Sequence, residues 1–536
     1  MASSGVDVKI EINKAFQETF KLIFGEGCEL ELDDLKDYMW RYHYPLHISK
    51  SAISGKEVAI AEDRYCKGAR IIADNESGQL RAPALNIDDL KDIDSIIEAA
   101  REIFYYAGES AYGNSDFVYR GDIFRDSFYV YNAHHMVSAK YAAYSSHLRQ
   151  DVDHVFGSSL FSNCRYLIKA MGAVKLARCF ETYSSSNSSD LFACYDCVGC
   201  THAMFSFNIR SKRYAIGNLE LPKDKYTTLR KKLSLDSKEY MEKNRTFPSI
   251  FEIPVPSPQV LASIRKISVP KRKPERTDIK KIDDAWRTTC KILLGKDIGP
   301  LQKYEKFLTQ RVNKIRKVKT VFGSDIVNSD MFFYKNVPEE RMVNFDEAVE
   351  IAKQHVTFED GGEVTLESIR EKISPIAFFR MDFHEGENEN NIETQFAYNA
   401  VNTYKVFDAT NSRNCAYSDM ILDSEYSFGS YRNVYSKFCI KCHSCAYTTA
   451  SFEIDSTPMT SNSMFCHGCE AIDNCLFCFK VKNLRYAVGN CVVGKENYAK
   501  IKKIVADEIV QYLEKDGMLP FDIFTIACYK PEKDKK

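Results

Sequence analysis

Several features that assign a protein to a class at once are missing from this sequence. Lys and Arg number 73 against 74 Asp and Glu, which leaves a net charge of −1. That balance gives no global attraction to nucleic acid or to a membrane surface. No apolar run reaches the length of a membrane span, and residues 1–9 lack the apolar core of a signal peptide. We therefore expect a cytoplasmic protein, with a virion component as the alternative.

A catalytic constellation is also missing. The short Gly-containing turns complete neither a P-loop nor a dinucleotide-binding pattern. No pair of carboxylates recurs at a constant step, as a glycan-cleaving solenoid would need. His134-His135 and the nearby Asp151, Asp153 and His154 could be drawn as an acid–base or metal cluster, but a polar corner of the fold is the favoured interpretation. The sequence names no catalytic residue.

What the sequence does contain is an internal repeat. Its 536 residues exceed what one core usually spans, so at least two domains are expected. The RYAIGN segment at 213–218 matches the RYAVGN segment at 485–490, and the same constant shift of the numbering, 485 − 213 = 272, aligns a long stretch of the two halves without gaps. We predict a tandem duplication, with one repeat at 12–256, the other at 284–530, and a Pro-rich, basic linker at 257–283.

Each repeat is predicted to have an α+β fold in three parts. A mixed helical and strand region, up to about residue 125 in the first repeat, precedes a strand array at about 126–218 or 398–490. An amphipathic helix follows at 223–243 or 496–516 and could cap the array. Because strands begin at 12- or 13-residue steps and are followed by small polar residues, we favour a parallel β-solenoid with about two strands per coil. Alternate strands would then share a face, and a β-sandwich is the alternative.

Eighteen cysteines in a cytosolic chain indicate buried small side chains or metal ligands before disulfides. Cys439 and Cys442 form one C-x2-C pair, and Cys466 and Cys469 form another further along the chain. This spacing fits a structural zinc site, and zinc is the cofactor that the sequence suggests. The first repeat lacks the first pair, so packing in the narrow interior of a stack is the favoured interpretation, and Fe–S ligation is the least favoured.

Arg213 and Arg485 stand at the same place in both repeats, each directly before a tyrosine, Tyr214 or Tyr486. We assign these four residues a structural role. Both guanidinium groups are expected to be partly buried and bonded to backbone carbonyls or a carboxylate where the array meets the following helix.

The segments around these arginines, NIRSKRYAIGN at 208–218 and KVKNLRYAVGN at 480–490, support a resemblance. They resemble the closing signature, NLRNKKYxIxNKxY after a Cys-rich stretch, of a family of uncharacterised repeat proteins in candidate-phylum bacteria, archaea and their phages. Some members carry a CaiB/BaiF-type CoA-transferase label, but no such pattern is present here. The resemblance covers about half of each repeat and implies no established reaction.

The leading hypothesis is a non-enzymatic structural or protein-interaction protein, pictured as one component of a larger assembly, with protein partners or self-assembly and no membrane contact. A zinc-binding, nucleic-acid-associated protein is the first alternative, using the cysteine pairs and the linker residues Lys271, Arg272 and Lys273. A glycan-acting enzyme on a β-helix is the second alternative.

Overall fold

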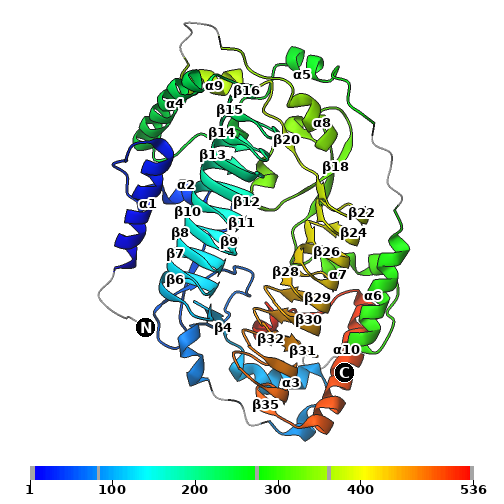
Figure 1. Ribbon diagram of the computed structural model, residues 1–536. Coiled ribbons are helices and arrows are strands. Elements are labelled where there is room, and N and C mark those ends of the chain that lie inside the picture. The colour runs from blue at the N-terminus through cyan, green and yellow to red at the C-terminus, as the bar shows by residue number, and fades with distance from the viewer. Residues whose placement is uncertain (1–6, 81, 83–84, 272–276, 359–363, 531–536) are drawn as a thin grey trace.

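The structure is a computed structural model that describes residues 7–80, 82, 85–271, 277–358 and 364–530. It mixes α-helices and β-strands, and two long stacks of mostly parallel strands dominate it (Figure 1). The first array spans residues 111–220 and the second spans 383–492. Both arrays therefore begin earlier than the predicted residues 126 and 398. No described helix is long and apolar enough to cross a membrane.

Most strands of both arrays are short, and β12, with 19 residues, runs through more than one turn. The first array consists of β5 (Ala111–Tyr112), β6 (Asp116–Arg125), β7 (Phe128–Val137), β8 (Ala139–Ala143), β9 (Ser146–Arg149), β10 (Val152–Phe156), β11 (Ser159–Ser162), β12 (Arg165–Tyr183), β13 (Ser186–Tyr195), β14 (Thr201–Met204), β15 (Arg213–Ile216) and β16 (Leu219–Glu220). The second consists of β21 (Phe383–Glu385), β22 (Glu389–Ile392), β23 (Phe396–Tyr398), β24 (Val401–Val406), β25 (Asp408–Thr410), β26 (Arg413–Leu422), β27 (Glu425–Phe428), β28 (Tyr431–Val434), β29 (Lys437–His443), β30 (Thr448–Asp455), β31 (Thr460–Ser461), β32 (Met464–His467), β33 (Ile472–Leu476), β34 (Arg485–Val488) and β35 (Cys491–Val492).

Outside the arrays lie small sheets and helices. The two-stranded sheets are β1 (His47–Lys50) with β2 (Glu57–Ile60), β3 (Ile71–Ala73) with β4 (Tyr106–Gly108), β17 (Ile315–Lys319) with β18 (Asp325–Ser329), and β19 (Met342–Val343) with β20 (Phe379–Arg380). The α-helices are α1 (Val8–Phe24), α2 (Lys36–Trp40), α3 (Ile93–Ala100), α4 (Lys223–Asn244), α5 (Pro258–Ile264), α6 (Ile279–Leu294), α7 (Glu305–Leu308), α8 (Phe345–Ile351), α9 (Leu366–Lys372) and α10 (Lys495–Asp516).

Within an array, the strands of successive turns pair in parallel, and the short last strands, β16 and β35, pair antiparallel with β15 and β34. Phe180 lies beside Phe192, a step of 12 in the numbering, and Ser146 lies beside Ser159, a step of 13. Each turn carries two strands, such as β8 and β9 followed by β10 and β11. The segments at 165–171, 178–183, 190–196 and 203–209, which follow one another at 12- or 13-residue steps, therefore belong to successive turns. Consecutive segments share a face, and the prediction that alternate segments do so was wrong, because a single 12- or 13-residue step already completes a turn.

A three-residue rhythm in the backbone explains why the turn is so short. Every third residue from 411 to 489 has a positive φ, and the same holds from 154 to 217. Non-glycine residues rarely adopt this left-handed conformation, and it redirects an extended chain sharply. A 12-residue turn contains four such positions, so the chain closes on itself after four short extended steps.

The residue that follows each left-handed position points into the stack. In the second array these interior residues form separate small cores, one made of Cys439, Cys442, Cys445, Ile454, Cys466, Cys469, Ile472, Cys475, Cys478 and Ala487. A 12-residue turn encloses little space, so cysteine, alanine, serine and threonine recur at these positions. The interior of the first array also holds leucines, at positions 148, 167, 176 and 191. The abundance of cysteine follows from this narrow interior.

A long helix packs along the flank of each array, and its contacts in the first half recur in the second. Phe16 of α1 meets Phe156 edge to face at 5.5 Å, and Trp286 of α6 meets Phe428 edge to face at 5.3 Å between ring centroids. Both helices follow an aspartate N-cap and end at a left-handed glycine.

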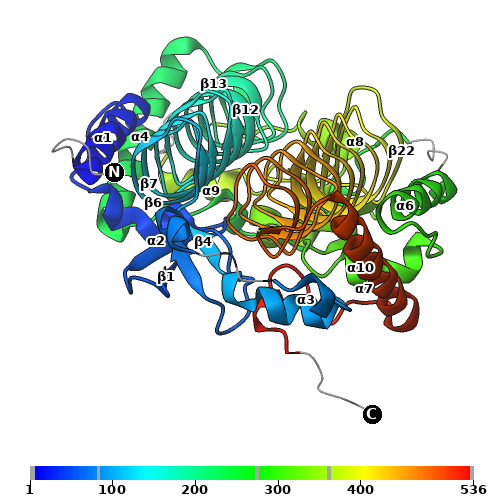
Figure 2. The same ribbon diagram turned by 90° about the horizontal axis from the view of Figure 1, so that it is seen from below.

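The small sheets, in contrast, pack on the opposite array. Phe104, which precedes β4, contacts Phe479 of the second array, and Phe379 of β20 contacts Phe207 of the first array. The Tyr195 hydroxyl donates a hydrogen bond to the Arg380 carbonyl oxygen at 2.6 Å. The two halves are thus interlocked, as the view along the stacks also indicates (Figure 2), and each buries part of the other's core.

The helices after the arrays do not cap them as predicted. α4 lies beside β15 and contacts α1, and α10 lies beside β34 and contacts α6. The last turns are covered by the opposite half instead. The Val356 N–H donates to the Gly217 carbonyl oxygen at 3.0 Å, and Ala100 lies against Gly489. The interlock leaves no room for a helix of the same half at that place.

The linker and one cysteine pair also differ from expectation. The segment 257–283 contains α5 and the start of α6, because Ser257 caps a helix whose first residue is Pro258. Cys66 and Cys528, 462 residues apart, form a disulfide that joins the first half to the end of the second. The expectation that the cysteines are free thiols or metal ligands fails for this pair.

Candidate functional site

A cleft of about 500 Å³ lies between the two arrays. His147, Arg149 and Asp196 line it from the first array, and Tyr398 and Asp408 line it from the second. Apolar rings such as Phe396 and Phe407 complete the lining. The cleft therefore combines apolar walls with a few convergent polar groups, the usual composition of a ligand pocket.

The charged groups of the cleft are strongly affected by burial. Burial raises the pKa of Asp408 to about 6, although a hydrogen bond from the Thr410 hydroxyl at 3.0 Å and the charge of Arg149 oppose the shift. Burial also lowers the pKa of Arg149. Asp196 is paired with Arg210 at 2.7 Å and with Arg380 at 3.6 Å. The Oδ2 atom of Asp196 thus pairs with an arginine from each half, whereas its buried Oδ1 has no hydrogen-bond partner among the described residues.

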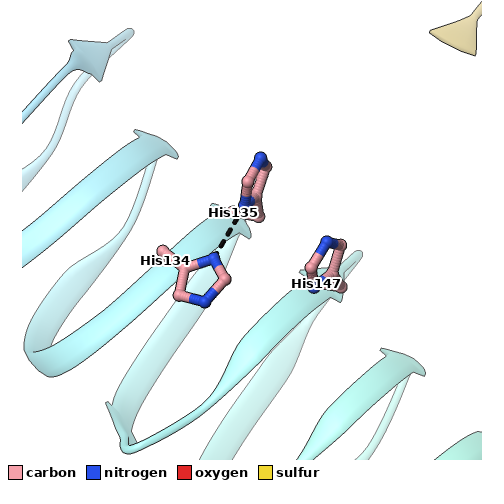
Figure 3. A group of neighbouring side chains, drawn as sticks. All are labelled: His134, His135 and His147. Atoms are coloured by element: carbon pink, nitrogen blue, oxygen red, sulfur yellow. Dashed lines mark hydrogen bonds between the residues drawn. The ribbon is translucent and has the colours of Figure 1, made fainter. Parts of the chain in front are cut away.

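Three buried histidines lie close together on β7 and β9 (Figure 3), and one of them, His147, lines the cleft. His134 and His135 are neighbours in β7, and His147 in β9 lies one turn above His135, with the two rings stacked at 4.7 Å between centroids. The Nδ1 atoms of His134 and His135 are 2.7 Å apart. Among the described residues, this is the one group of three His, Cys, Asp or Glu side chains whose ligand atoms all lie within 4.8 Å of one another.

The sequence pattern His134-His135 is therefore part of a cluster, but its partner is not the one considered from sequence. His154 hydrogen-bonds Asp153 at 2.8 Å on the outer side of the array and does not join the other two histidines. His147 was missed. The 12-residue turn would have identified it, because residue 147 lies one such turn after residue 135.

Buried Lys–Glu pairs occupy equivalent places in the two arrays. Lys441 and Glu453, on adjacent turns and 0% exposed, form an ion pair at 2.7 Å, and the Ile523 N–H also donates to Glu453. In the first array Lys169 and Glu181 take the same positions under the constant shift between the repeats. Burial raises the pKa of both glutamates, and it lowers that of Lys169 well below its usual range. Because both arrays keep the pair beneath covering segments, its role is to fasten those segments.

The structure separates the four cysteines predicted to bind zinc. Cys442 pairs with Ile454, and Ile454 pairs with Cys466, so the two C-x2-C pairs lie two turns apart. Two strand spacings amount to about 9–10 Å, whereas two sulfurs on one zinc ion are at most about 4.6 Å apart. The predicted site built from Cys439, Cys442, Cys466 and Cys469 is therefore not formed. All four side chains are fully buried in the interior of the second array.

The prediction that Arg213 and Arg485 are partly buried is wrong. Both side chains are exposed, because they stand at the outer start of β15 and β34. Arg485 does bond a carboxylate, Asp473, at 2.8 Å, but its side chain is 66% exposed. The two tyrosines make the joint instead: Tyr214 packs on Tyr226 of α4, and Tyr486 packs on Tyr498 of α10.

The basic run of the linker is only partly described. Lys271 is exposed, and Arg272 and Lys273 lie outside the described residues. Nothing in the described part of the chain brings this run to the cleft or to the histidines.

No protein-family model matches the chain, and no curated protein or solved structure matches it either. The resemblance of the RYA(I/V)GN segments to the Cys-rich repeat family therefore stays a prediction.

Proposed function

We propose that the protein is a non-enzymatic interaction scaffold, built from two β-solenoid repeats that arose by tandem duplication and binding another protein through its second array. The recurrence of the Phe16–Phe156 and Phe379–Phe207 contacts in the other half, and of a buried lysine and glutamate at the positions of Lys169 and Glu181, supports the duplication. Parallel pairing at 12- or 13-residue steps supports the solenoid.

One observation carries the proposed binding role. Tyr435, Tyr447 and Met459 follow one another at 12-residue steps, and their exposed fractions are 49%, 54% and 45%. The two tyrosine rings stack at 5.1 Å with an angle of 13° between their planes. Three adjacent turns thus present large apolar side chains to solvent as one stripe, which we call the Tyr–Met stripe. Aromatic residues and methionine are enriched in protein interfaces.

The Tyr–Met stripe continues a polar ladder that begins at the cleft. The Asn399 side-chain amide donates to Asn411 at 3.2 Å, and the Asn411 amide donates to Asp423 at 3.1 Å. Asn399 and Asn411 also line the cleft. The ladder and the stripe together form a straight strip of regularly spaced side chains, which favours an elongated partner segment.

The titratable groups of the molecule favour a scaffold over an enzyme. The ion pairs Lys441–Glu453 and Asp196–Arg210 and the tyrosine contacts to Glu181 all join one segment of the chain to another. These contacts fasten turns and covering segments within each half, which is a structural use of the titratable groups. No comparable observation in the described part of the chain supports a glycan-acting or nucleic-acid-binding function.

A site-specific photo-crosslinker at position 447, introduced in cells that make the protein, tests this proposal. We expect one discrete adduct, identified by mass spectrometry as another protein or a second copy of the chain. The matched control is position 119, because Tyr119 is 50% exposed on the first array, away from the stripe. No adduct at 447, or the same adducts at both positions, would contradict the proposal. Cleavage of a polysaccharide by the purified protein would replace it with an enzymatic function.

A further inference from the structure

The three buried histidines carry an inference that is independent of the scaffold proposal. His134, His135 and His147 are 1%, 5% and 2% exposed. They lie where the first array faces the second, and each ring is held from outside the cluster. The partners are contributed by the segment before β1 and by the second array, so the cluster forms only when the two halves are interlocked.

Each imidazole uses its Nε2 atom for an outward hydrogen bond. His134 Nε2 lies 2.8 Å from the Tyr44 carbonyl oxygen, His135 Nε2 lies 3.1 Å from the Ser444 hydroxyl, and His147 Nε2 lies 2.9 Å from the Tyr431 hydroxyl. A carbonyl oxygen can only accept a hydrogen bond, so neutral His134 carries its proton on Nε2 and a lone pair on Nδ1. Outward bonds of this kind orient the histidines that bind metals in proteins.

The Nδ1 atoms face inward, toward one another. Those of His134 and His135 contact only each other, and that of His147 has no hydrogen-bond partner among the described residues, although it is buried. A buried nitrogen without a partner costs about 1–3 kcal/mol. Burial lowers the pKa of all three side chains, that of His134 to about 4, so the rings are neutral near pH 7. Without a metal ion, His135 Nδ1 therefore donates to the Nδ1 lone pair of His134. His135 presents its own lone pair to a metal ion when its proton moves to Nε2, where the Ser444 hydroxyl accepts it.

We propose that the Nδ1 atoms of His134, His135 and His147 bind one divalent transition-metal ion of the zinc class at the junction of the two arrays. Three imidazole nitrogens with one open position form a known type of zinc coordination. Nitrogens on one tetrahedral ion are about 3.3 Å apart for Zn–N bonds of about 2.05 Å. The His134–His135 contact must therefore open from 2.7 Å by some tenths of an ångström. The ligand atoms that lie further apart, all of them within 4.8 Å, must come closer by rotation of the rings.

Arg432 determines what takes the open position. Its guanidinium donates to the His135 carbonyl oxygen at 3.4 Å, and its Nε has no partner among the described residues. A buried positive charge beside a cation is unfavourable, and burial already lowers the pKa of Arg432 to about 9. An anionic fourth ligand, such as hydroxide or chloride, would relieve the repulsion and would give the unpaired Nε an acceptor.

The test uses the full-length protein, stripped with a chelator and titrated with Zn²⁺ or Co²⁺. We expect one ion per chain by elemental analysis, and a Co²⁺ spectrum with ligand-field bands but no thiolate charge-transfer band. His147→Gln should abolish stoichiometric binding, and Ser444→Ala, which removes only an outward hydrogen bond, should weaken it about 10- to 100-fold. His154→Gln on the same array serves as the matched control and should bind as the wild type does.

Each outcome decides the proposal. It is overturned if the wild-type chain takes up no ion at stoichiometric level, if His147→Gln binds as tightly as the control, or if Co²⁺ shows thiolate ligation. Should His147→Gln fail to fold, the Co²⁺ spectrum of the wild type and the affinity of Ser444→Ala give the answer. None of these results depends on whether the Tyr–Met stripe binds a partner.

Discussion

The side-chain amide of Asn490 makes the two hydrogen bonds to the backbone of Phe479, one turn earlier, that a further strand would otherwise make. Its Oδ1 accepts a hydrogen bond from the Phe479 N–H at 2.9 Å, and its Nδ2 donates to the Phe479 carbonyl oxygen at 2.8 Å. Asn218 does the same for Phe207, at 2.8 and 3.1 Å. The asparagine of the RYA(I/V)GN segment thus closes the edge of each array by satisfying backbone groups that would otherwise stay unpaired.

We expect Asn218→Ala and Asn490→Ala to lower the free energy of unfolding by about 1–3 kcal/mol each, because each leaves a buried N–H and a carbonyl oxygen unpaired. Urea denaturation monitored by circular dichroism measures the change. Asn483→Ala is the matched control, since Asn483 is exposed and also left-handed, with φ 55°. It corrects for the cost of placing alanine in that backbone conformation. Equal losses in all three variants would show that the amide bonds contribute nothing.

The exposed arginines should contribute much less to the free energy of unfolding than the tyrosines that pack between array and helix. Arg213→Ala and Arg485→Ala should change the free energy of unfolding by less than about 1 kcal/mol, because exposed ion pairs contribute little. Tyr498→Ala should cost about 3 kcal/mol or more, because this ring is 3% exposed and packs on Tyr486. Thermal and urea unfolding of the three variants measure these losses of stability and show which is largest. A larger loss for either arginine would restore the role first expected for it.

Thiol reactivity should separate the interior cysteines from the others. Cys28 and Cys491 are the free cysteines that are partly exposed, and the remaining free cysteines are buried. Burial also raises the pKa of Cys442 and Cys478, which disfavours the reactive thiolate. Alkylation of the native protein at pH 8, followed by peptide mass spectrometry, should modify Cys28 and Cys491 alone, and all thiols should react in denaturant. Rapid native labelling of Cys442 would contradict a packed interior.

The histidines should make stability depend on pH in a defined direction. The pKa of His134 falls from its ordinary 6.5 to about 4 on folding, so between these values the unfolded chain binds a proton that the folded chain does not. Stability is therefore lost as pH falls from about 6.5 to 4, by at most about 1.4 kcal/mol per pH unit for one group. Asp419, whose pKa rises to about 7, has the opposite effect.

Because these contributions oppose each other, the difference between variants is the useful quantity. In chelator, His134→Gln should make the slope of unfolding free energy against pH less positive between pH 4.5 and 6.5 than in the wild type. Urea titrations at several pH values measure it. An unchanged slope would mean that His134 is protonated in the folded protein as readily as in the unfolded chain.

The strands of the two arrays could be predicted from the sequence more completely than the histidine cluster could. The constant shift between the repeats places Phe156 on Phe428 and Tyr214 on Tyr486, and each member of these pairs has an equivalent environment. The reciprocal packing of Phe104 and Phe379 could not be predicted, because a repeat in the chain does not say on which copy a segment folds.

The interior residues could have been predicted from a three-residue spacing of small side chains, which is harder to notice than the 12-residue step between strands. Small or slender residues recur at every third position, as at Cys439, Cys442, Cys445, Thr448 and Ser451. That spacing indicates that these residues line the interior of one narrow stack. Two cysteines at the same spacing also form a C-x2-C pair, and these pairs suggested zinc. The histidine cluster needs both the turn length and the position of the opposite array, so sequence alone gave only its first two members.

Cutting the chain between the halves tests the central claim, that the two arrays form one interlocked body. A protease site inserted between Ile267 and Asp278 would be cleaved in the folded protein under reducing conditions, so that the Cys66–Cys528 disulfide is open. The account predicts that the two fragments stay together in gel filtration and unfold in one transition, because each buries part of the other's core. Fragments that separate without denaturant, each retaining its strand content by circular dichroism, would contradict it.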